Sequence, residues 1–322
     1  QYQQAIIDYD RAIDLDPNSA VLYSNRGNAY SNLKQYQQAI IDYDRAIDLD
    51  PNNAVYYFNR GNAYFNLKQY QQALAGYNRA IDLDPKYVLA YNRRGNVYSN
   101  LKQYQQAIAD YARATELAPN NAVYYSNRGN AYSRLKEYQL ALADHDRALE
   151  LDPNLAWGYA NRGFTYLWLK DRGRALADYI HSWELDSTKI YRGWMVEWLR
   201  MYQERPSLTT GEQLEAVAAV DAQNYLAHVC LGVARWIRGD FDQALTELEL
   251  AVPLDPEKRD AYFWKGMVCA SLERDEEAME AIEKSLELEL PPLLLAPLRW
   301  FEEDRREFYE KYAISLLARY DF

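Results

Sequence analysis

The sequence has few of the residues that mark a secreted, membrane-spanning or disordered protein. Its 322 residues include two cysteines, Cys230 and Cys269, without the spacing of a metal site, and only 11 prolines. No apolar run near the N-terminus resembles a signal peptide, and the apolar stretch 290–298 is too short to cross a membrane. With 49% hydrophobic residues, the chain is predicted to fold, and we expect a reducing, cytoplasmic setting.

An excess of positive charge is also missing. The formal net charge is -11, which argues against nucleic acid as a partner. Residues 1–189 hold 21 basic and 21 acidic side chains, whereas residues 190–322 hold 15 basic and 26 acidic ones. Because the whole excess of acidic residues lies in the C-terminal part, the chain is expected to have two functionally distinct segments.

Candidate catalytic residues are equally scarce. The three histidines, His145, His181 and His228, are scattered along the sequence. The sequence has no glycine-rich phosphate loop, nucleophile motif or metal-binding pair. We therefore predict no enzyme activity, no metal and no cofactor.

Tyrosine, by contrast, is abundant, and its positions follow an internal repeat. There are 30 tyrosines against 8 Phe and 8 Trp. The sequence Gln-Tyr-Gln-Gln-Ala begins at positions 1, 35, 69 and 103, and prolines keep the same step at Pro17, Pro51, Pro85, Pro119 and Pro153. A period of 34 residues held over five turns predicts a repeat architecture.

Within each repeat, aromatic and small residues alternate in a fixed order that resembles the tetratricopeptide-repeat family over nearly the whole chain. In the repeat that begins at Ala20 the positions are Tyr23, Gly27, Tyr30, Ala39, Tyr43, Ala46 and Pro51. The resemblance implies an all-α fold, a right-handed superhelical solenoid of antiparallel helix pairs. In the fourth repeat, His145 replaces the third aromatic residue and is predicted to be buried.

The small residues of this pattern predict a close helix crossing. Gly27 and Ala39 would let two backbones approach, and Tyr43 would fill the space beside the contact with its hydroxyl near the edge. Pro51 ends the second helix because it lacks an N–H, and Asn53 can cap the next helix. Most of the tyrosines are therefore predicted to be structural.

The repeat boundaries divide the sequence into five segments. The first matches only the second helix of a repeat, which we interpret as the truncated start of a fragment from a longer protein. The segments are a truncated repeat at 1–19, five regular repeats at 20–189, a degenerate repeat at 190–224, two further repeats at 225–290, and capping helices at 291–322.

The degenerate repeat departs from the pattern, and the irregularity begins near residue 187. Trp198 falls where glycine is expected, and Thr210 falls where the small alanine is expected. An indole at the crossing would prevent the close approach of two helices. Pro206 and Gly211 mark an altered turn, so that helices are predicted near 191–203 and 212–220.

The resemblance also implies a binding groove, because the first helix of each repeat lines the concave wall in this family. The candidate groove residues are Asn28, Phe58, Asn62, Phe65, Asn92, Arg93, Asn96, Asn130 and Arg134. An asparagine amide both donates to and accepts from a peptide backbone, which suits an extended segment. The alternative is that recent repeat duplication simply retained asparagine. The lysines with which some members clamp chaperone tails are missing, so chaperone-tail binding is not expected.

A second candidate lies where the regular repeats end. The concave positions there change from polar residues to Trp157, Phe164 and Trp168, with further rings at Tyr191, Trp194, Trp198 and Tyr202. Aromatic anchors in a concavity are typical of binding hot spots. Alternatively, these rings fill the gap where regular packing breaks. We expect Trp194 to be buried and Trp168 to be exposed in the groove.

These observations predict a module that binds a protein or peptide segment in its concave groove. The repeat style is similar to arrays in bacterial signalling and defence proteins, where the array would sense a ligand and control a separate N-terminal effector domain. The alternatives are a structural scaffold or self-assembly segment, and a small-molecule sensor at the aromatic cluster. Neither a membrane nor a nucleic acid is expected as a partner.

Overall fold

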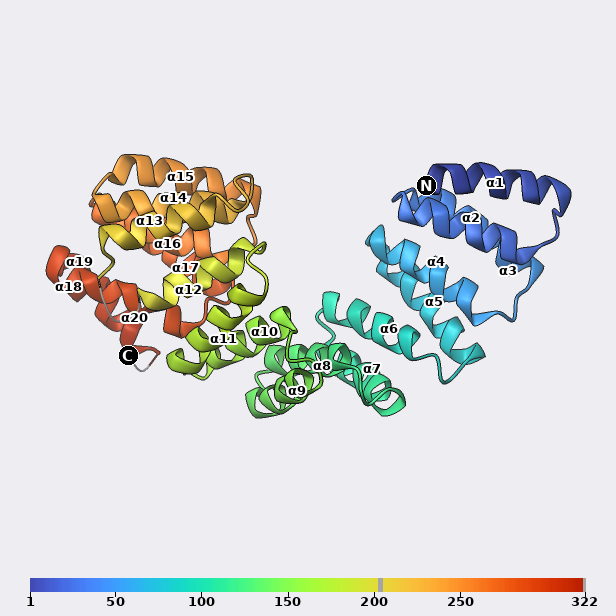
Figure 1. Ribbon diagram of the computed structural model, residues 1–322. Coiled ribbons are helices and arrows are strands. Elements are labelled where there is room, and N and C mark those ends of the chain that lie inside the picture. The colour runs from blue at the N-terminus through green and yellow to red at the C-terminus, as the bar shows by residue number, and fades with distance from the viewer. Residues whose placement is uncertain (202–204, 321–322) are drawn as a thin grey trace. The chain divides into compact units, whose positions relative to one another are not determined.

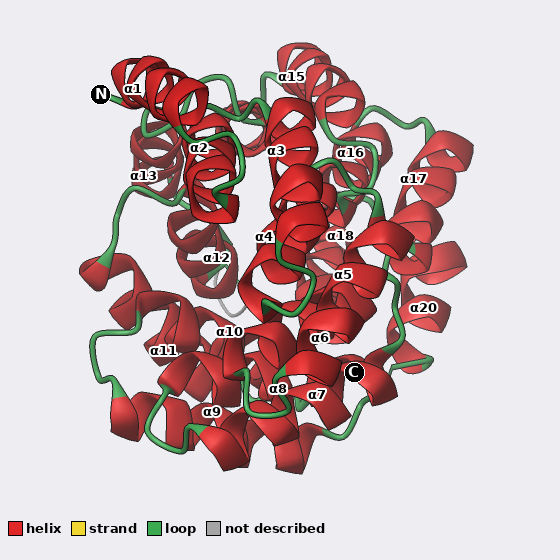
Figure 2. Ribbon diagram, turned by 90° about the vertical axis from the view of Figure 1, so that its right-hand side faces the viewer, coloured by secondary structure: helices red, strands yellow, loops and turns green. Residues whose placement is uncertain are grey.

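A computed structural model describes residues 1–201 and 205–320, so Tyr202 lies outside the described residues. The described part is helical throughout and has no strand, and short loops join its helices (Figure 2). It divides into two compact units, unit 1 (Gln1–Leu151) and unit 2 (Asp152–Phe322). The unit boundary falls between the fourth and fifth of the predicted regular repeats.

Unit 1 consists of nine helices, the single helix α1 followed by four consecutive antiparallel pairs from α2 to α9 (Figure 1). Two helices of one repeat pack on each other, as α2 on α3 and α4 on α5, and each second helix also packs on the next first helix. The helices are α1 Tyr2–Leu15, α2 Ala20–Asn32, α3 Tyr36–Leu49, α4 Ala54–Asn66, α5 Tyr70–Leu83, α6 Val88–Asn100, α7 Tyr104–Leu117, α8 Ala122–Arg134 and α9 Tyr138–Leu151.

The close crossing predicted from glycine is present in every regular pair. A Cβ on Gly61 would lie 2.8 Å from Cε1 of Tyr77, and one on Gly95 would lie 2.7 Å from Cε1 of Tyr111. Both distances are well inside van der Waals contact, so only glycine leaves room for the ring. In the fourth repeat the same contact is made by Gly129 and the buried His145, which confirms the predicted core role of this histidine.

The arginine that precedes the glycine ties the two helices of a pair together in four of the five regular repeats, whereas Arg60 pairs with Asp44 on the preceding helix α3. Arg94 Nε and Nη2 donate to the two carboxylate oxygens of Asp110 at 2.8 and 2.6 Å, and the guanidinium also lies 5.6 Å from the ring centroid of Tyr91. The hydrogen bond to Asp110 raises the pKa of Arg94. Bidentate pairs of this kind fix orientation as well as adding energy. The equivalent pairs are Arg26 with Asp42, Arg128 with Asp144, and Arg162 with Asp178.

Unit 2 repeats this architecture and then departs from it. Its helix pairs are α10 with α11, α14 with α15, and α16 with α17, and Gly232 and Gly266 lie against Leu248 and Ile282 in place of tyrosine. The helices are α10 Ala156–Trp168, α11 Arg172–Leu185, α12 Ile190–Arg200, α13 Leu208–Ala218, α14 Tyr225–Arg238, α15 Phe241–Leu254, α16 Arg259–Ser271 and α17 Asp275–Glu287. Among the described residues, no helix is long and apolar enough to cross a membrane.

The irregular segment forms two short helices that do not cross as a regular pair. The helix α13 begins at Leu208, before the predicted 212, because Ser207 and Thr210 form a capping box at its N-terminus. It packs mainly on α14. Trp198, at the predicted glycine position, is buried and stacks on Phe263 of α16 at 5.6 Å between ring centroids.

The tryptophans of this region form the core of unit 2. Trp194, Trp198 and Trp264 are all at most 1% exposed, and their rings contact one another. The predicted core burial of Trp194 is therefore confirmed. In a regular repeat, small residues let two helices cross closely. In this region, large rings fill the space between the helices instead.

The C-terminal segment follows α17 and reaches well beyond that last helix. Its 3-10 helix η1 packs on α10, and Trp300 stacks on Trp236 of α14 at 5.7 Å between ring centroids. Arg305 donates to the carbonyl oxygen of Ala270 in α16. The elements are η1 Pro292–Trp300, α18 Phe301–Asp304, α19 Arg306–Phe308, the π-helical turn η2 Tyr309–Ala313 and α20 Ile314–Ala318. The segment thus covers first helices of unit 2.

We expect Gly95→Ala to lower the free energy of unfolding, measured by urea denaturation. The added methyl group meets the Tyr111 ring, and overpacking costs ~1–3 kcal/mol. The gain in helix propensity from alanine is smaller, at most about 1 kcal/mol.

Gly173→Ala is the matched control, because a Cβ at this exposed helical glycine meets only Asp171 Oδ1 at 3.8 Å. The control is expected to be neutral or slightly stabilising. Equal stability of the two variants would contradict the crossing role of Gly95.

Candidate peptide-binding groove

The first helices of the repeats in unit 1 lie next to one another. The helix α2 contacts α4, α4 contacts α6, and α6 contacts α8. Hydrogen bonds join them directly, since the Asn59 amide donates to Asn28 Oδ1 at 3.2 Å and the Asn127 amide donates to Asn92 Oδ1 at 2.9 Å. We call the surface formed by α2, α4, α6 and α8 the inner face of unit 1.

The asparagine at the ninth position of each repeat connects this face with the core. The hydroxyl of Tyr77 donates to Asn62 Oδ1 at 2.8 Å, and the amide of Asn66 donates to the backbone carbonyl of Asn62 at 2.9 Å. The same tyrosine bond recurs from Tyr43 to Asn28 and from Tyr111 to Asn96. Because these Oδ1 atoms are engaged, the NH2 group is what each asparagine offers to a ligand.

A pocket of about 250 Å³ lies on the inner face between α4, α6 and α8. Its lining combines two aromatic residues with amides and a serine hydroxyl. The lining residues are Phe65, Asn96, Ser99, Asn100, Tyr111, Asn127 and Asn130. Three predicted groove residues, Phe65, Asn96 and Asn130, thus lie together in one concave site.

Two of the predicted groove residues are instead buried, and for them the prediction was wrong. Phe58 is 8% exposed and packs on Tyr77 and on Tyr87, at 5.8 and 4.9 Å between ring centroids. Asn92 is also 8% exposed, and its Oδ1 accepts the amide of Asn127. The fifth position faces the neighbouring repeat here, so its side chain joins the core between the two repeats.

The two predicted arginines of unit 1 are exposed. Arg93 lies close enough to Tyr77 and Tyr124 for its charge to oppose the rise in their pKa that burial causes. Arg134 ends α8. The sequence did not predict Asn127 as a groove residue, although Asn127 belongs to the repeated Asn-Arg-Gly-Asn motif. The spacing within one repeat does not show that the first asparagine of this motif contacts the neighbouring repeat.

The predicted aromatic residues Trp157, Phe164 and Trp168 lie on α10 in unit 2, and all three are partly buried. Phe164 and Trp168 meet edge to face at 6.3 Å between ring centroids. The neighbouring Leu167 is fully buried, and η1 packs on the same helix. Much of the first-helix surface of unit 2 is therefore occupied by the protein's own C-terminal segment.

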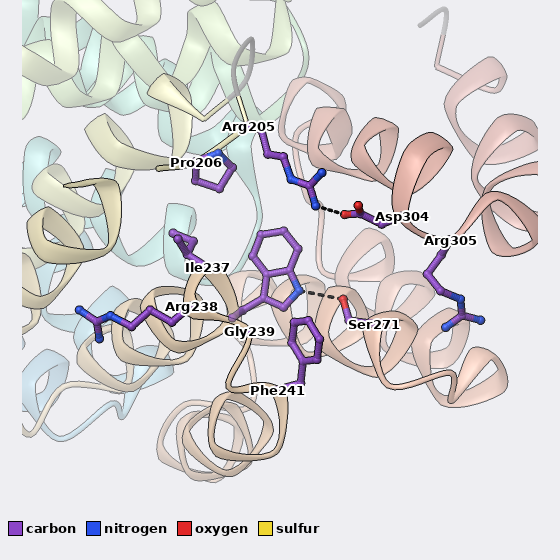
Figure 3. Close-up of a pocket in the computed structure, with 10 residues that line it drawn as sticks. Arg205, Pro206, Ile237, Arg238, Gly239, Phe241, Ser271, Asp304 and Arg305 are labelled. Carbon is purple, nitrogen blue, oxygen red and sulfur yellow. Dashed lines mark hydrogen bonds and ion pairs between the residues drawn. The ribbon is translucent and has the colours of Figure 1, made fainter. Parts of the chain in front are cut away.

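A second pocket, of about 380 Å³, lies in unit 2 beside Trp236 (Figure 3). The indole N–H of Trp236 donates to Ser271 Oγ at 2.8 Å, and Phe241 also lines the pocket. The charged groups at its rim are paired: Arg205 with Asp304, Arg238 with Glu215, and Arg305 with Asp275. Its polar groups are thus used to hold the C-terminal segment and α13 in place.

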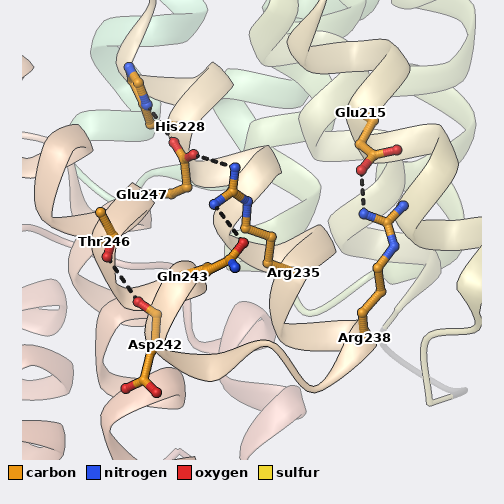
Figure 4. A network of polar contacts seen from close by, with 8 residues as sticks. All are labelled: Glu215, His228, Arg235, Arg238, Asp242, Gln243, Thr246 and Glu247. Atoms are coloured by element: carbon orange, nitrogen blue, oxygen red, sulfur yellow. Dashed lines mark hydrogen bonds and ion pairs between the residues drawn. The ribbon is translucent and has the colours of Figure 1, made fainter.

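The remaining histidines take part in packing and ion pairs. His228 Nδ1 lies 2.8 Å from Glu247 Oε2, and Arg235 pairs with the other oxygen of Glu247 at 2.9 Å, which ties α14 to α15 (Figure 4). His181 contacts Tyr159 edge to face at 4.4 Å between ring centroids. Each histidine has a structural partner.

Comparison with known families agrees with this geometry. The family described as "Tetratricopeptide repeat" matches residues 20–53, 88–121 and 122–155, and further tetratricopeptide-repeat families match 1–34, 42–75, 61–102 and 231–289. Together these matches cover more than half of the sequence. The chain belongs to the tetratricopeptide-repeat family.

Two solved structures with TM-scores above 0.5 show the same fold as this tetratricopeptide-repeat protein. A tetratricopeptide repeat protein from Parabacteroides merdae is similar with a TM-score of 0.55 and 15% identity, over 82% of this chain and 97% of that one. The Cut9–Hcn1 hetero-tetramer of the APC/C gives a TM-score of 0.53 and 14% identity, over 90% and 50%. The first TPR domain of Spaghetti bound to an HSP90 peptide is 35% identical, with a TM-score of 0.36, over 36% and 93%. No curated protein matches the sequence.

The buried tyrosines predict a loss of stability at high pH. Burial raises the pKa of Tyr43, Tyr77 and Tyr111 above the ordinary value of 10.0. Above pH 10 the unfolded protein releases these protons while the folded protein keeps them. The free energy of unfolding should therefore be fully present below pH 10 and fall above it, by up to ~1.4 kcal/mol per pH unit for each buried tyrosine.

Urea denaturation between pH 8 and pH 12 measures this slope in Tyr77→Phe. At neutral pH the free energy of unfolding of the variant should be lower by about 1 kcal/mol, because the hydrogen bond to Asn62 is lost. Above pH 10 its free energy of unfolding should fall less steeply with pH than that of the original protein. Tyr2→Phe, at an exposed tyrosine, is the control and should keep the original slope. An unchanged slope in Tyr77→Phe would show that Tyr77 ionises while folded.

Proposed function

We propose that the inner face of unit 1 binds an extended protein segment, mainly through its backbone. The observation that carries this proposal is the pocket that brings Phe65, Asn96 and Asn130 together. The Phe65 ring and several amides in a concave site suit a peptide, since the amides pair with backbone groups and the ring packs against one side chain.

The asparagine row favours ligand carbonyl groups. In Asn28, Asn62 and Asn96 the side-chain oxygen already accepts a tyrosine hydroxyl, so that the NH2 group is the donor left for a partner. The buried tyrosines hold these amides in one orientation, and pre-ordered groups lose less entropy on binding. A row of donors at one per repeat fits a peptide with regularly spaced carbonyls and needs no particular side-chain sequence.

In this proposal the protein recognises a partner and catalyses no reaction. The tetratricopeptide-repeat fold is generally a protein-interaction scaffold, and the histidines here serve its packing. The similarity in repeat style to arrays of bacterial signalling and defence proteins extends the proposal to a cytoplasmic sensing role, in which the bound segment controls an effector domain of the same protein.

The test is selection of peptides from a displayed random library on the purified protein, followed by calorimetry. Phe65→Ser introduces the residue that the other regular repeats of unit 1 carry at this position, Ser31, Ser99 and Ser133, and should leave the fold intact. We expect it to weaken a selected peptide about tenfold, ~1.4 kcal/mol.

Ile41→Ser, which removes an exposed apolar side chain from α3, is the matched control and should bind as tightly as the original protein. Equal affinity of the Phe65→Ser variant would place the peptide elsewhere. A failure to select any peptide, together with concentration-dependent oligomers in light scattering, would favour the scaffold or self-assembly alternative.

A further inference from the structure

A second row of side chains lies on the inner face of unit 1, beside the asparagine row. In each first helix, the residue seven positions before the ninth-position asparagine is aliphatic and exposed. Residues seven apart lie on the same side of a helix, so each aliphatic side chain shares a side with its asparagine. These residues, which we call the aliphatic row, are Val21, Val55, Leu89 and Val123, with exposed fractions of 57%, 45%, 48% and 37%.

The two rows advance together, by one aliphatic side chain and one asparagine per repeat. Neighbouring first helices contact each other directly, and packed helices lie roughly 8–10 Å apart, so both rows repeat at about this interval. On this side of the first helices, at the aliphatic residue and four, seven and eleven positions after it, only Arg93 and Arg134 are charged. Hydrogen-bond donors and apolar groups with few charges match a ligand segment that is itself uncharged.

The interval between the repeats distinguishes the regular conformations that a ligand segment can adopt. A strand presents a side chain to the same side every two residues, about 6.7 Å, which is shorter than the interval. An α-helix does so every seven residues, about 10.5 Å, but its carbonyls already accept internal hydrogen bonds. A polyproline II helix has three residues per turn, advances about 9.3 Å per turn and has no internal hydrogen bonds. Of these conformations, only polyproline II fits both the spacing and the row of NH2 donors.

We infer that the segment bound by the inner face of unit 1 is a polyproline II helix with an aliphatic side chain at every third position. The inference rests on the function proposed above and adds the conformation of the ligand and the spacing of its side chains. Each turn of the ligand places one apolar side chain against the aliphatic row and one backbone carbonyl at an asparagine NH2 group. Proline suits the positions between, because it keeps its carbonyl, has no N–H to leave unpaired and loses little entropy on binding.

The test compares two capped, uncharged peptides by calorimetry on the full chain. The first peptide is Leu-Pro-Gln repeated four times, which places leucine at every third position. The second has the same composition, with its leucines at every second position. We expect the first peptide to bind at least tenfold more tightly than the second. NMR of the ¹³C-labelled first peptide in the complex measures its backbone angles, which should lie near φ ≈ −75° and ψ ≈ +145°.

Leu89→Ser removes one member of the aliphatic row and should weaken the first peptide about fivefold, because less apolar surface is buried on binding. Leu140→Ser, at a side chain of α9 that is 50% exposed, is the matched control and should bind the peptide as tightly as the original protein. Both variants replace an exposed side chain, so the fold should stay intact.

Equal or tighter binding of the second peptide, or strand-like or helical backbone angles in the complex, would overturn the inference. The library selection separates this failure from a failure of the proposed function. If selected peptides bind and Phe65→Ser weakens them, while the first peptide does not bind, the proposed function stands and the polyproline II inference is wrong. If neither designed nor selected peptides bind, both are wrong.

Discussion

The contact between a glycine and the ring of the facing helix is the constraint on which this structure depends. At Gly27, Gly61 and Gly95 the ring of a tyrosine occupies the place where a side chain would be. The two helices of a repeat can cross closely only because one side of the crossing has no Cβ. The arginine–aspartate pair one residue before Gly27 and before Gly95 joins the same two helices.

The same crossing links the core with the candidate groove. The ring that fills the glycine gap ends in a hydroxyl, and that hydroxyl reaches the asparagine one residue after the glycine. Stability and the proposed recognition therefore share residues. An asparagine of the inner face is not simply a surface residue, because its oxygen satisfies a buried phenol and its NH2 group remains for a partner.

Unit 2 uses its first helices differently. Leucine and isoleucine replace tyrosine against Gly232 and Gly266, so the hydroxyl that orients the asparagine amides is lost there. Tryptophans fill the centre instead, and the C-terminal segment packs on α10, α14 and α16. The two units therefore differ in chemistry: amides line the pocket in unit 1, and large aromatic rings form the core of unit 2.

The sequence by itself determined the helix pairs, the glycine crossings and the buried place of His145, because a period of 34 residues fixes which positions face each other within a repeat. The resemblance to the tetratricopeptide-repeat family implied that Phe65, Asn96 and Asn130 lie on one face, and one pocket of unit 1 contains all three. The repeat pattern could not reveal that Phe58 and Asn92 are buried, since their burial comes from contact with the following repeat. Only the tertiary structure decided where the C-terminal segment packs, because its contacts with α10, α14 and α16 join residues far apart in the sequence that no local period relates.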